Sequence, residues 1–144
     1  MAKASTSLGH TYNSWGRTRG PKNLNGAHGN EVDVVAVSAL VDATDGYSTE
    51  NQMYLHVMLI DKHNSTNLTV TLYGYSHAFG KWAPLNQLNG STAATVTVAD
   101  SGVAEGSQTA AHREMVCFEI AGVDRIGFVG TTADVRCYAA GSTL

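Results

Sequence analysis

The segment 74–78 comes nearest to a catalytic motif in this chain of 144 residues. It reads Gly-Tyr-Ser-His-Ala, whereas the nucleophile elbow of a hydrolase reads Gly-x-Ser-x-Gly and lies in a strand–turn–helix unit of an α/β fold. The second glycine is missing here, and the segment runs from a β-rich stretch into an expected loop. We therefore assign no nucleophilic role to Ser76, and we expect no catalytic residue and no enzymatic activity.

Histidines and acidic residues are the next candidates, because they could ligate a metal ion. The six histidines are His10, His28, His56, His63, His77 and His112. None pairs as H-x-H or H-x-x-x-H, and no glutamate has the spacing of a jelly-roll metal site. Asp42, Asp45 and Glu50 share one stretch of turn-forming residues, but their spacing is not that of an EF-hand. The sequence thus predicts neither a metal site nor a cofactor.

The two cysteines, Cys117 and Cys137, belong to no C-x-x-C pair. Each lies in an expected strand, and another expected strand separates them in sequence. We interpret both as small buried apolar side chains. A disulfide between them would need neighbouring strands and an oxidising compartment, and the sequence leaves that possibility open.

Charge is distributed unevenly along the chain. Residues 1–30 carry four basic residues and no acid, a formal charge of +4, whereas the rest has five basic and twelve acidic residues, a charge of −7. We expect residues 1–30 to form an extended basic arm, which contacts a partner or its own domain through Trp15, Arg17, Arg19 and Lys22. Four spaced charges fall short of a nucleic-acid footprint, and no apolar run reaches 18 residues. We therefore expect neither a nucleic acid nor a membrane as partner.

Short β-rich segments separated by turn signals fill residues 31–144, which we predict to be one domain. About seven strands are expected, spaced as in an antiparallel β-sandwich or jelly roll. They are 32–41, 53–61, 68–75, 92–100, 113–120, 126–129 and 134–140. The segment 76–93 is expected to be a loop. The fold class is therefore all-β, with the arm of residues 1–30 preceding the sandwich.

The stretch 113–130 is predicted to be a β-hairpin at the centre of the core, because two apolar runs flank a small-residue turn. Gly122 and Gly127 would allow a tight bend or a close backbone approach. Arg125 alternates with the apolar residues around it and so should point away from the core. We interpret its pairing with Asp124 as a solvated or interface ion pair.

The segment 53–61 is apolar on both faces. One face carries Met53, Leu55, Val57 and Leu59, and the other carries Tyr54, Met58 and Ile60. A strand in a two-layer sandwich buries only one face, so the second needs cover from elsewhere. We predict a subunit interface through Tyr54, Met58 and Ile60, with burial by the 76–93 loop as the alternative. Residues 32–41 are expected to behave in the same way.

The pattern of the whole chain resembles small capsid decoration (cement) proteins of tailed bacteriophages. The resemblance lies in the Gly/Asn/Ser-rich basic arm from Ser5 to Asn30, in a low-charge body rich in Ala, Thr and Val, and in the small-residue tail YAAGSTL. It implies a non-enzymatic virion structural protein that binds and stabilises a protein shell as an oligomer, with a trimer favoured. The partner would be the major capsid protein or another lattice protein of the virion.

A second resemblance is to galactose-binding-like sandwiches. It rests on Trp82-Ala83-Pro84-Leu85 and on the later Gly-Val-Asp-Arg-Ile-Gly-Phe-Val. It implies an alternative function as a receptor- or carbohydrate-binding module of a tail or fibre, with Tyr73, Tyr75 and Trp82 as ligand-binding residues. Phe79 could join them. The same aromatic side chains could equally anchor the core and its loops.

Overall fold

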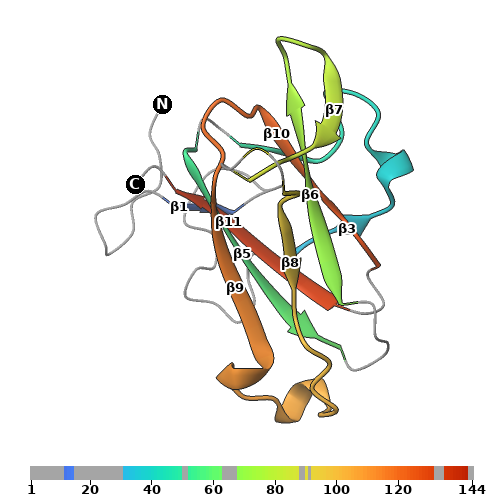
Figure 1. Cartoon of the computed structure of the whole chain (residues 1–144), viewed down its shortest axis with the longest axis vertical. Helices are drawn as coiled ribbons and strands as arrows, with labels where there is room; N and C mark the ends of the chain where they lie inside the picture. Colours follow the sequence, from blue (N-terminus) through green and yellow to red (C-terminus); the bar gives the residue numbers. More distant parts are fainter. Residues whose placement is uncertain are drawn as a thin grey trace.

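Two β-sheets pack face to face around one apolar core (Figure 1). The computed structural model describes residues 12–14 by their backbone, and residues 31–49, 52–62, 68–87, 90, 92–131 and 135–142. The prediction of an all-β sandwich is confirmed. Within the described ranges no helix is both long enough and apolar enough to cross a membrane.

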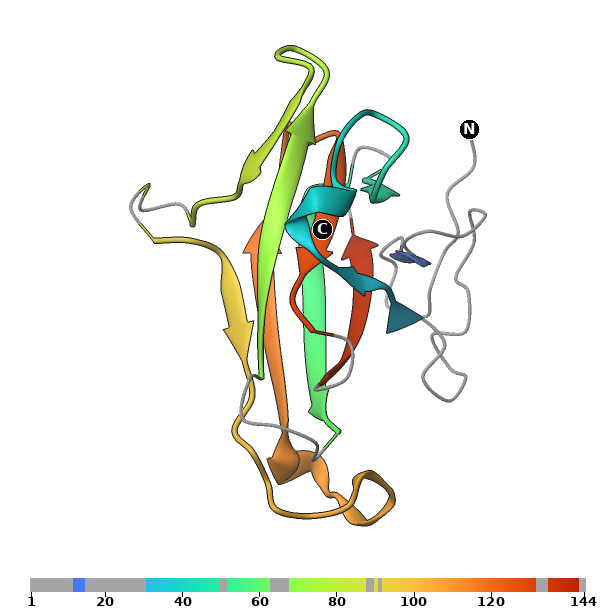
Figure 2. The same cartoon turned by 90° about the vertical axis from the view of Figure 1, so that its right-hand side faces the viewer.

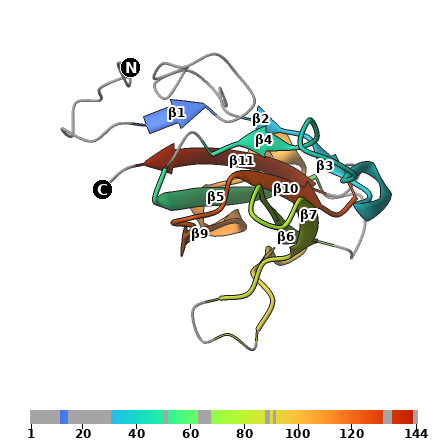
Figure 3. The same cartoon turned by 90° about the horizontal axis from the view of Figure 1, so that it is seen from above.

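The first sheet has the order β1-β11-β5-β9, and β2 also pairs with β11. Its strands are β1 (Tyr12–Ser14), β2 (Glu31–Val32), β5 (Tyr54–Asp61), β9 (Arg113–Glu119) and β11 (Val135–Ser142). Every pairing in it is antiparallel. β1 belongs to the expected arm and lies alongside β11 (Figure 3).

The second sheet has the order β3-β10-β6-β7, with β4 on β10 and β8 on β6. Its strands are β3 (Val34–Val35), β4 (Tyr47–Ser48), β6 (Thr69–Ser76), β7 (Lys81–Pro84), β8 (Thr95–Thr97) and β10 (Arg125–Val129). Only β3 runs parallel to its partner. Three 3₁₀ turns complete the described elements, namely η1 (Val37–Ala39), η2 (Glu105–Ser107) and η3 (Ala110–His112). Figure 2 shows η2 and η3 at one end of the sandwich and the β6–β7 hairpin at the other.

The connectivity is that of a jelly roll. The chain passes from the second sheet to the first between β4 and β5 and returns at β6. It crosses again from β8 to β9, from β9 to β10 and from β10 to β11. As a result, strands from separate halves of the chain pair with each other, as β5 does with β11 and β6 does with β10.

The core lies between the two sheets and follows the alternation of the strands. Leu55, Val57 and Leu59 of β5 are buried against the second sheet, where Leu72 and Phe128 are equally buried. Successive residues of a strand point to opposite faces, so the apolar positions of 53–61 and 68–75 correctly predicted these inner faces.

The predicted hairpin at 113–130 is wrong, because β9 and β10 lie in different sheets. The connection leaves β9 and turns at Gly122, whose φ is 85°, with the Val123 N–H donating to the Ile120 carbonyl. Both apolar runs face the same core from opposite layers, and the sequence pattern does not distinguish this from a hairpin. The expected close approach at Gly127 is confirmed, since a Cβ placed there would lie 2.6 Å from Leu40 Cδ1.

Residues 32–41 form no continuous strand, contrary to the prediction. β2 pairs with β11 in the first sheet and β3 pairs with β10 in the second, and the turn η1 follows. The run is apolar because it contributes to both layers in succession: Val32 and Val34 are both buried in the one core. It is therefore not a two-faced strand, and it needs no cover from another subunit on that ground.

The expected loop 76–93 contains a strand, β7, which pairs with β6. The sequence did not predict β7 because the segment contains Pro84. Proline cannot donate a ladder hydrogen bond and is confined to edge strands and strand ends. β1, β4 and β7 are short strands that the sequence did not predict, and 32–41 divides into β2 and β3, so the described residues form eleven strands instead of seven.

Candidate interaction surfaces

The outer face of the first sheet is built from rows of side chains that the register places side by side. One row is Tyr138–Met58–Met115, and the next is Ala140–His56–Cys117. Met115 is 69% exposed and Cys117 is also exposed, whereas Met58 is half-buried and Tyr138 is buried. Toward β9 this face therefore offers methionine and cysteine side chains to an outside partner.

The three predicted interface residues do share this outer face, since they alternate along β5. Tyr54 and Met58 are half-buried, but Ile60 is only 3% exposed. Ile60 lies between Arg136 and Arg113 in the register and lines a cavity of about 500 Å³. It is already covered within the chain, so the accessible part of the face lies around Met58 and Met115.

Ion pairs close the end of the face at which Ile60 lies. Arg136 donates from Nε to a Glu105 carboxylate oxygen at 2.5 Å and from Nη1 to Glu31 at 3.1 Å. These bonds to Glu105 and Glu31 raise the pKa of Arg136, so the guanidinium stays charged. Burial, followed by the charge of Glu31, raises the pKa of Tyr138 to about 12, so its hydroxyl is neutral at pH 7.

His56 lies on this outer face rather than in the core. Its Nε2 is 3.1 Å from the Ser142 hydroxyl, and burial lowers its pKa. A histidine with a lowered pKa is neutral at physiological pH. The ring therefore adds no charge beside Met58 and Cys117, and the face stays largely apolar there.

The two cysteines differ in environment, and both are free thiols. Cys137 is buried as predicted, and burial raises its pKa to about 12. Cys117 is exposed, so its interpretation as a buried side chain was wrong. The two strands that carry them flank β5, and Cys137 faces inward while Cys117 faces outward, so they do not form a disulfide in this structure.

The second sheet carries an aromatic cluster on its own outer face. Tyr75 lies opposite Trp82 across β6 and β7, with ring centroids 5.5 Å apart, and His77 meets Tyr75 edge-on at 5.4 Å. Tyr73 lies on the same face, opposite Pro84. The structure thus brings together the three residues proposed for ligand binding, but Tyr75 is only 7% exposed.

The loop 41–46 packs against this aromatic cluster and is held by specific bonds. Trp82 Nε1 donates to the Asp42 carbonyl at 2.9 Å. Arg125 donates from Nε to the Asp45 carbonyl at 2.6 Å and from Nη2 to the Gly46 carbonyl at 2.9 Å. Arg125 points away from the core as expected, but it anchors a loop, so its interpretation as an ion pair with Asp124 was wrong.

The acidic side chains near this loop are already engaged by the backbone. Asp45 Oδ2 accepts the N–H groups of Val41 and Asp42, and Asp124 Oδ2 accepts the N–H of His77. In the described part of the chain no three histidine, cysteine or acidic residues gather as a metal site would require. Glu50, His10, His28 and His63 lie outside the described residues.

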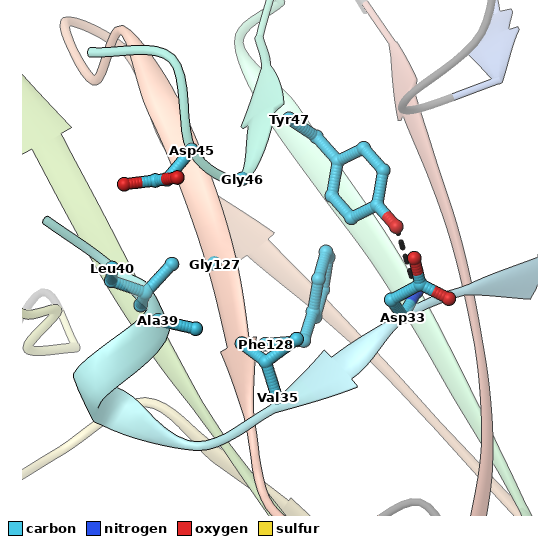
Figure 4. A pocket seen from close by; sticks show the side chains of 9 residues that line it. All are labelled: Asp33, Val35, Ala39, Leu40, Asp45, Gly46, Tyr47, Gly127 and Phe128. Atoms are coloured by element: carbon cyan, nitrogen blue, oxygen red, sulfur yellow. Dashed lines mark hydrogen bonds between the residues drawn. The ribbon is translucent and has the colours of Figure 1, made fainter. Parts of the chain in front are cut away.

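A cavity of about 280 Å³ opens beside the loop, between β3, β4 and β10 (Figure 4). Tyr47 lies across from Leu40, and its hydroxyl accepts the Asp33 N–H at 2.7 Å. Figure 4 shows Leu40 next to Gly127, where the absence of a side chain admits it. Two polar side chains here accept backbone N–H groups: the Tyr47 hydroxyl from Asp33, and the Asp45 carboxylate from Val41 and Asp42.

The expected arm residues Trp15, Arg17, Arg19 and Lys22 lie outside the described residues.

Sequence reasoning also missed Met115, which it placed in a buried run. The missed signal is the alternation of Arg113, Met115, Cys117 and Glu119, which puts two charged residues on the same face as the two sulfur-containing side chains.

No protein-family model matches the chain, and neither a curated protein nor a solved structure is significantly similar to it.

Proposed function

We propose that this chain is a non-enzymatic structural protein of a virion, which docks on a protein shell as a capsid decoration protein through the outer face of its first sheet. The observation that carries the proposal is the row Tyr138–Met58–Met115, which ends in a methionine that is 69% exposed. The resemblance of the basic arm and the low-charge body to decoration proteins points to the virion and to a shell protein as the partner.

The composition of the face supports protein as the partner. Interfaces between proteins combine an apolar centre, often with aromatic residues and methionine, with a polar rim. Here Met58 and Met115 form the accessible centre, with the buried Tyr138 next to Met58, and Arg113 and Glu119 flank Met115 along β9. Methionine adapts its shape to an irregular partner surface at small cost. A shell repeats the same partner surface many times, so many copies of this chain can bind to it. Together the bound copies would stabilise the shell.

The first test is binding to shells assembled from the major capsid protein encoded in the same genome. The Met115→Asp variant is expected to bind at least about tenfold more weakly than the wild type, because a charge would replace a central apolar contact. Cosedimentation measures the effect. Val41→Asp is the matched control, since Val41 is 70% exposed but lies on the loop over the second sheet, and it should bind like the wild type. Failure of the wild type to bind, or equal loss in both variants, would contradict the proposal.

A carbohydrate-binding function is the second candidate, favoured by the shared face of Tyr73, Tyr75 and Trp82. The rings of Tyr75 and Trp82 pack on each other, and the indole N–H is taken by Asp42, so little of the cluster remains for a sugar. We expect the wild type to bind no sugar on a glycan array. Saturable binding that Trp82→Ala abolishes, with an unchanged unfolding midpoint, would instead support this alternative.

A further inference from the structure

Strand β9 forms the edge of the first sheet, with β5 on one side and no paired strand among the described residues on the other (Figure 1). We propose that two copies of the chain pair along β9, antiparallel, about a two-fold axis through Val116. The two first sheets would then join into one continuous sheet. This inference does not require a shell, so it can fail or succeed independently of the proposed function.

The edge is exposed along most of its length, although Leu85, Asn86 and Gln87 line a cavity of about 260 Å³ with its half from Val116 to Glu119. Of its seven residues, Arg113, Glu114, Met115, Cys117 and Glu119 are exposed. It contains no proline and no glycine, and it pairs with β5 without a bulge. Proteins normally protect such an edge with a proline, a bulge or a covering segment, because its unpaired backbone groups are a template for another strand.

The backbone alternation sets which residues face the open side. The Ile120 N–H donates to the Met53 carbonyl on the β5 side, at 2.8 Å. Hydrogen-bonding direction alternates along a strand, so Glu114, Val116 and Phe118 also bond toward β5. The N–H and C=O groups of the odd-numbered residues 113–119 therefore point to the open edge, where an antiparallel copy can meet them.

The sequence of β9 is complementary to itself in one register. When Val116 lies opposite its copy, Arg113 lies opposite Glu119 of the partner subunit, and Met115 lies opposite Cys117 of the partner subunit. All four side chains are on the outer face. Opposite charges directly across an antiparallel pair are stabilising, and like charges are destabilising.

Other registers lose this match. A shift by two residues in either direction leaves Arg113 or Glu119 opposite an uncharged side chain. A shift by four residues does the same, and a shift by six brings Arg113 against its own copy, or Glu119 against its own copy. Only the register centred on Val116 places Arg113 opposite Glu119 of the partner subunit. The two-fold axis repeats this contact, so the dimer contains two such pairs.

The pairing would also join the outer faces of the two copies. Met115 would lie beside Cys117 of the partner subunit, which is itself next to His56 of the partner subunit in the register. The apolar rows would thus continue from one copy into the next. A doubled face of this kind is a better surface for a shell than the face of a single copy.

Disulfide trapping of the Met115→Cys variant tests the register. Residues that exchange both hydrogen bonds in an antiparallel pair have Cα atoms about 5.5 Å apart, which a disulfide can span. The variant is expected to form a covalent dimer with oxidised glutathione, whereas the wild-type Cys117 thiols would be diagonal neighbours about 7–8 Å apart and should not bond. The buried Cys137 does not compete. Val41→Cys is the exposed control and should stay monomeric on a denaturing gel. A wild-type disulfide dimer, or no dimer in Met115→Cys, would overturn the proposed register.

Charge reversal tests the pairing without any covalent bond. Arg113→Glu and Glu119→Arg should each weaken dimerisation at least about tenfold in sedimentation analysis, because like charges would then face each other. The double variant Arg113→Glu/Glu119→Arg restores opposite charges in this register only, and its affinity should return to near that of the wild type. A wild type that stays monomeric, or that forms a trimer, would overturn the inference.

Discussion

Replacing Gly46 with alanine is expected to lower the free energy of unfolding by about 3 kcal/mol, a loss as large as that of a damaged core. Gly46 has a φ of 66°, a backbone conformation that L side chains rarely adopt. A Cβ there would lie 2.6 Å from the Ile126 carbonyl oxygen and 2.7 Å from the Trp82 ring. The carbonyl belongs to a buried strand and cannot easily move. Urea unfolding followed by tryptophan fluorescence measures the loss.

Gly102→Ala is the matched control for this prediction. Gly102 has nearly the same φ, 65°, but no atom lies within 4 Å of its added Cβ. It should cost only about 1 kcal/mol, the price of the left-handed conformation alone. The difference between the two variants then measures how tightly the loop 41–46 packs on Trp82. Equal losses would mean that the loop is not packed there, and the aromatic cluster would be more open to a ligand than we propose.

The inner faces of the long strands could be predicted from the sequence because each strand follows one period. In β6 the buried Val70 and Leu72 alternate with the half-buried Thr69 and Thr71, and the first pair belongs to the apolar core. Alternation depends only on the geometry of the strand itself, so it can be recognised without knowing the strand's partners.

The assignment of strands to sheets could not be predicted in the same way. β9 and β10 follow each other closely, and a hairpin and a crossover between layers bury the same apolar residues. The chain from Val32 to Val35 posed the same difficulty, since both sheets draw on one short apolar run. In a jelly roll most pairings join distant segments, and the pattern of a single segment carries no information on its partner.

The candidate surface was predictable in part. Period two placed Tyr54, Met58 and Ile60 on one face of β5, and the structure confirms that placement. It could not show that Ile60 is already covered within the chain, or that Met115 is the most exposed residue of the row. Both depend on the position of a strand in its sheet, and β9 is exposed because it is an edge.

Asp61 shows how a polar group can be as important to stability as the apolar core. It ends β5 and is fully buried. Its Oδ2 accepts the backbone N–H and the hydroxyl of Ser101, both at 2.8 Å, and its carbonyl accepts Gln108 Nε2 at 2.8 Å. These bonds fix the segment that leads into η2, from which Glu105 pairs with Arg136 at the end of the outer face.

Asp61→Ala is therefore expected to lower the free energy of unfolding by about 3 kcal/mol, because it leaves the Ser101 N–H and hydroxyl donors without their carboxyl acceptor. Asp61→Asn keeps an acceptor oxygen and should lose less. Asp100→Ala is the nearby control, since Asp100 is exposed and bonds the Gly102 N–H at 3.1 Å, and it should cost under about 1 kcal/mol. Denaturant unfolding ranks the three variants. Hydrogen exchange at the Ser101 amide should accelerate in Asp61→Ala beyond its overall loss of stability, because the local bond is broken as well. An unchanged exchange rate, or a loss no larger than that of the control, would show that Asp61 does not hold this segment.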